Sequence, residues 1–178
     1  KDVAARAKKK YREIIAKLPE FDKRDRFEMN IVNCAMLAAF ILCMPQRPDI
    51  KTLTDYYAAA MMTPTMKAFC RASGKKKFTP KDIEGMKATA KLRAGDRNPY
   101  SWNMDFFEYE DGSGYEARFY KCGICVLTKE LGLYDLTPAM CRLDYTMAEA
   151  GEASDFVREY TLASGGSYCD CGYHKKQK

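Results

Sequence analysis

The sequence predicts an α+β protein in which N-terminal helices pack on a four-stranded antiparallel sheet, made of two hairpins separated by two helices. Apolar residues recur at helical spacing through residues 3–94. From residue 98 the apolar residues alternate as in strands, and this alternation returns near the C-terminus. Two further helical segments lie between these regions. We expect a single domain over residues 1–178, with a helical part at 1–97 and a hairpin–helix–helix–hairpin part at 98–174.

The helical part contains four expected helices, each bounded by a proline, a glycine or a capping residue. Pro64 should kink or restart the third helix, because proline cannot donate to the preceding turn. Thr79-Pro80 gives the fourth helix a capping hydroxyl and a proline at its first position. The expected spans are 3–18, 27–44, 53–72 and 79–94.

The second part begins where the apolar period changes at Asn98-Pro99. Trp102, Met104 and Phe106 alternate with polar residues, and Phe107 breaks the phase in a way that is compatible with a bulge. A Gly-rich turn at 111–114 should close the first hairpin. We expect strands at 102–106, 115–121, 156–162 and 168–173, helices at 122–131 and 138–150, and a frayed tail at 174–178.

Composition and charge exclude several classes of protein. The 178 residues are 47% hydrophobic and 12% aromatic, which excludes a disordered chain, and no run of eighteen apolar residues could cross a membrane. Residues 1–97 hold 22 basic and 11 acidic side chains. The basic runs lack interleaved aromatics, so we expect solvated helix faces and no nucleic-acid partner, although this half could attract small anions or face the acidic half. Self-association remains open.

Eight cysteines are too few for a disulfide scaffold at this length, and no signal segment opens the chain, so we expect a cytoplasmic protein. Cys34, Cys43 and Cys70 lie in apolar helical runs and should be core thiols. Cys122 and Cys125 lie where a strand gives way to a helix, whose N-terminus could lower the pKa of Cys122. Such a pair can serve redox chemistry or bind a metal.

Two further groups could carry chemistry. Cys141, Asp144 and Tyr145 share one face of a helix, so a nucleophile and an acid lie one turn apart. The alternative is a core thiol with a locally paired acid. In the closing hairpin, Arg158 could bind a substrate carboxylate or pair on the surface.

The second part resembles the L-2-amino-thiazoline-4-carboxylic acid hydrolase family. The resemblance covers about residues 100–173 and rests on short pieces in order: Cys122, Glu130-Leu131-Gly132-Leu133, Leu136, Pro138, Cys141, Asp144, Arg158, Thr161-Leu162-Ala163, Gly165-Gly166 and Cys169-Asp170. Cys171 replaces an aromatic residue of the family pattern, and Cys125 is an addition to it.

The resemblance implies a hydrolase that acts on carbon–nitrogen bonds of a cyclic amidine, opening a thiazoline ring to give a carbamoyl-cysteine. Such chemistry needs a nucleophile or base, a proton donor and a cation for the substrate carboxylate. The implied catalytic residues are Cys141, Asp144, Cys169 and Asp170, and the implied substrate-binding residues are Cys122, Arg158 and Thr161. The expected partner is a small-molecule substrate, with no cofactor.

Two other classes remain open. The ending is also similar, more remotely, to vinyl-reductase-type ligand-binding domains, which would make this a non-enzymatic small-ligand or sensor domain. Alternatively, the spacing C-x2-C-x15-C-x27-C-x-C offers enough thiols for a zinc-stabilised interaction module, with His174 as the one histidine.

Overall fold

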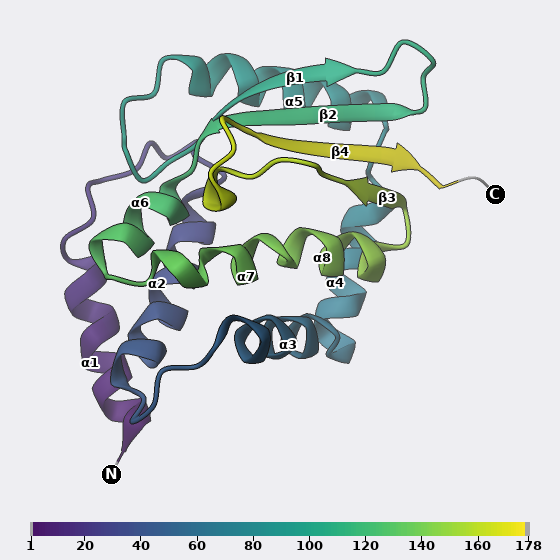
Figure 1. The fold of residues 1–178 in the computed structure, drawn as a ribbon. Coiled ribbons are helices and arrows are strands. Elements are labelled where there is room, and N and C mark those ends of the chain that lie inside the picture. Colours follow the sequence, from purple (N-terminus) through teal and green to yellow (C-terminus); the bar gives the residue numbers. More distant parts are fainter. Residues whose placement is uncertain (1, 177–178) are drawn as a thin grey trace.

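A computed structural model describes residues 2–176, in which helices cover one antiparallel sheet (Figure 1). The sheet has the strand order β1-β2-β4-β3. This arrangement confirms the predicted α+β class. The strands are β1 (Asn103–Glu108), β2 (Gly114–Lys121), β3 (Ser154–Val157) and β4 (Cys169–Lys175). The longer helices are α1 (Val3–Ile15), α2 (Glu28–Cys43), α3 (Ile50–Met61), α4 (Pro64–Gly74), α5 (Pro80–Ala94), α6 (Gly123–Glu130) and α8 (Leu143–Gly151). The short helical elements are η1 (Tyr134–Leu136) and α7 (Thr137–Cys141) between α6 and α8, and η2 (Leu162–Ser164) between β3 and β4.

Helix boundaries follow local capping chemistry. Thr79 Oγ accepts a hydrogen bond from the N–H of Asp82 at 3.2 Å, so α5 begins at Pro80 as expected. The span expected at 53–72 is two helices, because Pro64 starts α4 as its first residue and Asp49 caps α3 three residues earlier than predicted. The span expected at 138–150 is likewise divided at Arg142 into α7 and α8.

The second hairpin differs from its prediction. The strand expected at 156–162 ends at Val157, because the carboxylate of Asp170 accepts the N–H groups of Glu159 and Tyr160 at 3.0 and 2.7 Å and draws the chain out of the ladder. The tail expected to fray at His174 instead continues β4 to Lys175, paired with Ser154. Residues 177–178 of that tail lie outside the described part. The ladder irregularity falls at Asn103/Met104, not at Phe107.

The two faces of the sheet have different surroundings. Met104, Ala117 and Cys171 lie on a buried face that packs with Phe27 and Met86. On the other face Asp105, Phe107 and Tyr120 are exposed, as alternation along a strand requires. The buried face is covered by α8 and α5, and α4 packs on α8 (Figure 1).

A buried ion pair joins the segment before α2 to the end of α5. Arg93, whose side chain is 2% exposed, donates to Asp25 at 2.8 Å, and it also contacts Asp96. Ser101 donates to the same Asp25 carboxylate. Because the Asp25 side chain is fully buried, its charge depends on these donors, and they fix this segment against the end of α5 and the residues that precede β1.

Candidate functional site

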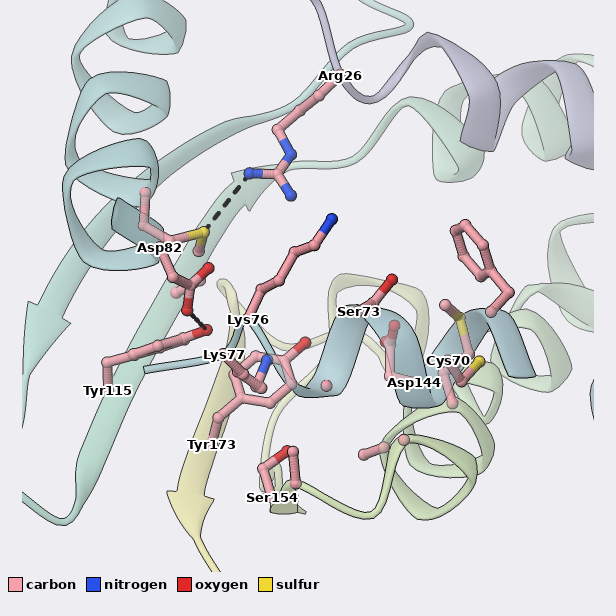
Figure 2. A pocket seen from close by; sticks show the side chains of 18 of the residues that line it. Arg26, Cys70, Ser73, Lys76, Lys77, Asp82, Tyr115, Asp144, Ser154 and Tyr173 are labelled. Carbon is pink, nitrogen blue, oxygen red and sulfur yellow. Dashed lines mark hydrogen bonds between the residues drawn. The ribbon is translucent and has the colours of Figure 1, made fainter. Parts of the chain in front are cut away.

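A cavity of about 440 Å³ lies between the helical part and the buried face of the sheet. The walls come from α4, the start of α5, α8, β2, β4 and the segment before α2. Polar side chains from these different elements converge on it in Figure 2, among them Arg26, Lys77, Tyr115, Asp144 and Tyr173. A hollow of this size with a few convergent polar groups is the usual form of a small-molecule site.

Asp144 is the carboxylate that α8 presents to the cavity. The Asp144 side chain lies inside the protein but is 42% accessible to solvent. Its accessible surface is the part that faces the cavity. Burial raises the pKa of Asp144, and this effect outweighs the opposing charges of Arg158 and Lys77. The ion pair with Arg158 at 2.6 Å favours the carboxylate form, while the raised pKa makes that carboxylate a stronger base than an ordinary aspartate.

Arg158 holds Asp144 and is itself held on several sides. Its guanidinium donates to Asp144 and to the carbonyl of Cys141, lies 3.8 Å from Cys171 Sγ, and is 5% exposed. Tyr145 donates to the Arg158 carbonyl at 3.2 Å. Burial opposes the charge of Arg158, but Asp144 and Cys171 more than offset this and its pKa is raised. Arg158 therefore orients Asp144 and does not line the cavity.

Lys77 and Tyr173 face the cavity beside Asp144 (Figure 2). The Lys77 Nζ lies 3.4 Å from the ring centroid of Tyr173 and 5.2 Å from that of Tyr115. Burial lowers the pKa of Lys77 to about 8, opposed by the charge of Asp82. Burial raises the pKa of Tyr173 well above its ordinary value, so its hydroxyl keeps its proton at neutral pH.

The turn before α5 directs Lys77 inward. Phe78 adopts a left-handed φ of 62°, which is unfavourable for a bulky residue. Asp82 stabilises this turn by accepting the N–H of Phe78 at 2.8 Å and the hydroxyl of Tyr115 at 3.0 Å. The Phe78 and Tyr115 rings also pack with centroids 5.1 Å apart. These contacts fix the backbone that carries Lys77.

The predicted thiols gather outside the cavity lining. Cys122 lies close enough to Cys141 and Cys169 for its charge to raise the pKa of each, although burial is the larger cause. Burial raises the pKa of Cys141 to about 12. The prediction of a lowered pKa for Cys122 was wrong, because a hydrogen bond with the Cys125 thiol and burial outweigh the N-terminal amides of α6. These thiols are protonated at neutral pH and are poor nucleophiles.

The other predicted residues have partners in the backbone. Thr161 Oγ accepts the N–H of Ser164 at 3.1 Å and caps η2, and Cys169 Sγ accepts the N–H of Leu162 at 3.2 Å. Asp170 pairs in register with Arg118, so it points away from the buried face of the sheet. These residues shape the loop that follows β3 and lie apart from the cavity.

Neither a cluster of metal ligands nor a membrane-spanning helix is present among the described residues. Across 2–176, no three His, Cys, Asp or Glu side chains are placed to hold a metal ion together. Within the same range, no helix combines the length and apolar character that a bilayer span needs.

Asp144 is thus the one of the seven predicted site residues that lines the cavity. Sequence reasoning missed the cations Arg26, Lys76 and Lys77 and the hydroxyls of Tyr115 and Tyr173. One signal was present: the run of lysines directly precedes the Thr79-Pro80 cap, so a sharp turn had to orient it. We expected the basic half to attract small anions, but the sequence did not indicate which of its cations would line a cavity.

Comparison with known proteins supports the resemblance noted in the sequence. Residues 29–173 match the family described as L-2-amino-thiazoline-4-carboxylic acid hydrolase. The match is longer than the expected 100–173, and it includes α4 and α5 with their cavity residues. No curated protein and no solved structure matches significantly.

Proposed function

We propose that this chain, which belongs to the L-2-amino-thiazoline-4-carboxylic acid hydrolase family, opens the ring of a cyclic amidine of the thiazoline type in the cavity at Asp144. The observation that carries this proposal is a basic carboxylate, oriented by a buried arginine, on the wall of a cavity large enough for such a ring. A family name alone does not fix a reaction, whereas this geometry supports activation of a water molecule.

Asp144 acts as the general base. It takes a proton from water, whose oxygen forms a bond to the ring carbon that bears the amino group. The adjacent ring nitrogen accepts a proton as its double bond becomes single. The bond that then breaks is the carbon–sulfur bond of the ring and not a carbon–nitrogen bond, as the resemblance had implied. Sulfur leaves with the electron pair and takes a proton, and a carbonyl forms. One water is consumed and a carbamoyl-cysteine is released.

Tyr173 is the proton donor that the geometry favours. Its hydroxyl is protonated at neutral pH and faces the same cavity as Asp144. Arg158 is a positioning residue, because it contacts Asp144 and not the cavity. The buried thiols have no role as nucleophiles in this proposal, since their raised pKa values keep them protonated.

Asp144→Asn tests the proposal, because asparagine keeps an acceptor for Arg158 but cannot take a proton. We expect kcat for 2-aminothiazoline-4-carboxylate to fall by about 10²–10⁴-fold, with little change in KM. Chromatography of the carbamoyl-cysteine product measures the rate. Glu149→Gln, an exposed change on the same helix, is the matched control and should retain full turnover.

Retention of most of the turnover in a folded Asp144→Asn protein would overturn the role of Asp144. A Cys141→Ser protein that loses turnover as completely would restore the thiol mechanism. If the unaltered protein opens no thiazoline or related cyclic amidine, the hydrolase proposal fails in favour of a ligand-binding domain.

A further inference from the structure

The cavity carries an excess of positive charge that the hydrolysis of an amidine does not use. Arg26, Lys76 and Lys77 line it from one side. Two acids lie opposite, but Asp82 accepts from Phe78 and Tyr115, and Asp144 is paired with Arg158. The cavity is therefore electropositive on the side formed by the end of α4 and the turn that follows it.

The cations on this side lack acidic partners. Within residues 2–176, no carboxylate forms an ion pair with Arg26, Lys76 or Lys77. Arg26 Nη1 instead lies 3.7 Å from the thioether sulfur Sδ of Met86. Lys77 is surrounded by the rings of Tyr173, Tyr115 and Phe78, which attract a cation but cannot accept its three N–H donors as a carboxylate does. Its donors are left for a group that enters the cavity.

Lys77 lies deeper in the cavity than the other two cations, Arg26 and Lys76. Lys77 is partly buried against the aromatic rings, whereas Arg26 and Lys76 are exposed. In Figure 2 the side chain of Lys76 extends toward that of Arg26, so the two lie together at the rim. An anion can be drawn to the rim by two mobile charges and then bound by one fixed charge inside.

We propose that Lys77, assisted by Arg26 and Lys76 at the rim, forms a subsite that binds the carboxylate of a small organic acid and orients it toward Asp144. This inference rests on the proposed function for the identity of the reacting group, but the binding of an anion does not depend on hydrolysis. In this proposal Lys77, and not Arg158, is the residue that selects an acid, because the donors of Arg158 are occupied by Asp144 and the carbonyl of Cys141.

Calorimetric titration of the Asp144→Asn protein tests the subsite, because this variant leaves the ligand intact. The probes are 2-aminothiazoline-4-carboxylate and 2-aminothiazoline, which lacks the carboxylate. We expect the acid to bind about tenfold to a hundredfold more tightly than the amine, as a charged hydrogen bond in a recessed site provides. Inorganic phosphate is the third probe and should bind more weakly than the acid.

Lys77→Met in the same background should remove the preference for the acid, since methionine keeps the packing against Tyr173 but not the charge. Lys75→Met is the matched control, because Lys75 is exposed and outside the cavity, and it should leave both affinities unchanged. If Lys77→Met does not fold, Arg26→Gln at the exposed rim should still weaken binding of the acid and spare the amine.

Equal binding of acid and amine, no binding of the acid, or tighter binding of phosphate would overturn the subsite. So would a folded Lys77→Met protein that keeps the preference. The outcomes separate the two proposals. If binding of the acid depends on Lys77 but the unaltered protein opens no ring, the hydrolase proposal fails and the subsite stands. If the unaltered protein opens the rings of the acid and the amine equally fast, the hydrolase proposal stands and the subsite fails.

Discussion

Lys77 is the residue whose chemistry depends most directly on its surroundings. Its amine is buried against Tyr173 and Tyr115, and burial lowers its pKa to about 8. Asp82 on α5 and Asp144 on α8 favour the charged form, whereas Arg26 opposes it. A lysine in this environment can lose its proton at a pH where an exposed lysine remains charged.

The affinity for a carboxylate ligand should therefore depend on pH. Lys77 is mostly charged below about pH 8 and mostly neutral above it, and Asp144→Asn lowers this pKa further because it removes a carboxylate that favours the charged form. Binding of 2-aminothiazoline-4-carboxylate to the Asp144→Asn protein should therefore be strong at about pH 6 and weaken as the pH rises to about 9. Calorimetry across this range measures the change. Lys77→Arg keeps its charge, so its affinity should not weaken over the same range; identical pH profiles for the two proteins would contradict the assignment.

The sequence could identify Asp144 but not the residues opposite it. Cys141, Asp144 and Arg158 occur in a short stretch whose order and type suggest chemistry. Lys77 reaches the same cavity only because a left-handed Phe78 turns the chain and α4 packs on α8. Such a contact between distant segments leaves no spacing pattern, so a run of lysines is indistinguishable from a solvated loop until the fold is known.

At the scale of elements, the walls of the cavity depend on a close approach of α4 and α8. A Cβ built on Gly74 would lie 2.4 Å from the carbonyl oxygen of Gly151, which is closer than such atoms can approach. The two helices can thus touch backbone to backbone only where glycine is present. This contact sets the distance between the end of α4, with Lys76 and Lys77 just beyond it, and Asp144 on α8.

Gly74→Ala should force α4 away from α8. We expect the free energy of unfolding to fall by about 1–3 kcal/mol, as overpacking does in well-packed interiors, together with slower turnover. Urea unfolding measures the first effect. Gly85→Ala on α5 is the control, since no atom lies within 4 Å of its added Cβ, and it should stabilise the protein by roughly 0.5–1 kcal/mol. Equal effects of the two changes would argue against a tight helix contact.

The elements themselves were predictable wherever local chemistry decides them. Proline, glycine and capping threonine set the limits of α5 and the start of α4, and alternation identified β1 and β2. Prediction failed at β3, where Asp170, ten and eleven residues further along than Tyr160 and Glu159, accepts the N–H groups that a strand would have used. It failed at His174 too, because pairing with the neighbouring β3 extends β4.

At the scale of the molecule, Arg93 and Asp25 join the end of α5 to the segment that precedes α2. Both side chains are almost entirely buried and depend on each other for charge compensation. Asp25 also immediately precedes Arg26 at the rim of the cavity, so the pair fixes the position of one of the proposed anion-binding residues. Both the stability of the fold and the geometry of the cavity rim therefore depend on the Arg93–Asp25 pair.

Arg93→Met should lower the free energy of unfolding by about 3–5 kcal/mol, because it leaves the Asp25 carboxylate buried without its partner. Adding Asp25→Asn should recover part of the loss by removing that charge. Denaturant unfolding measures both. Lys51→Met, which breaks an exposed pair with Asp55, is the comparison and should leave the unfolding midpoint nearly unchanged. A similar small effect for Arg93→Met would contradict the structural role of the pair.

The cavity takes its basic side chains from before the sheet and its carboxylate base from after the first hairpin. Under the two proposals, selection of the acid and activation of water therefore belong to separate stretches of polypeptide. Changes around α4 would alter which acid is bound and leave the carboxylate on α8 in place, so selectivity and catalytic power could evolve independently.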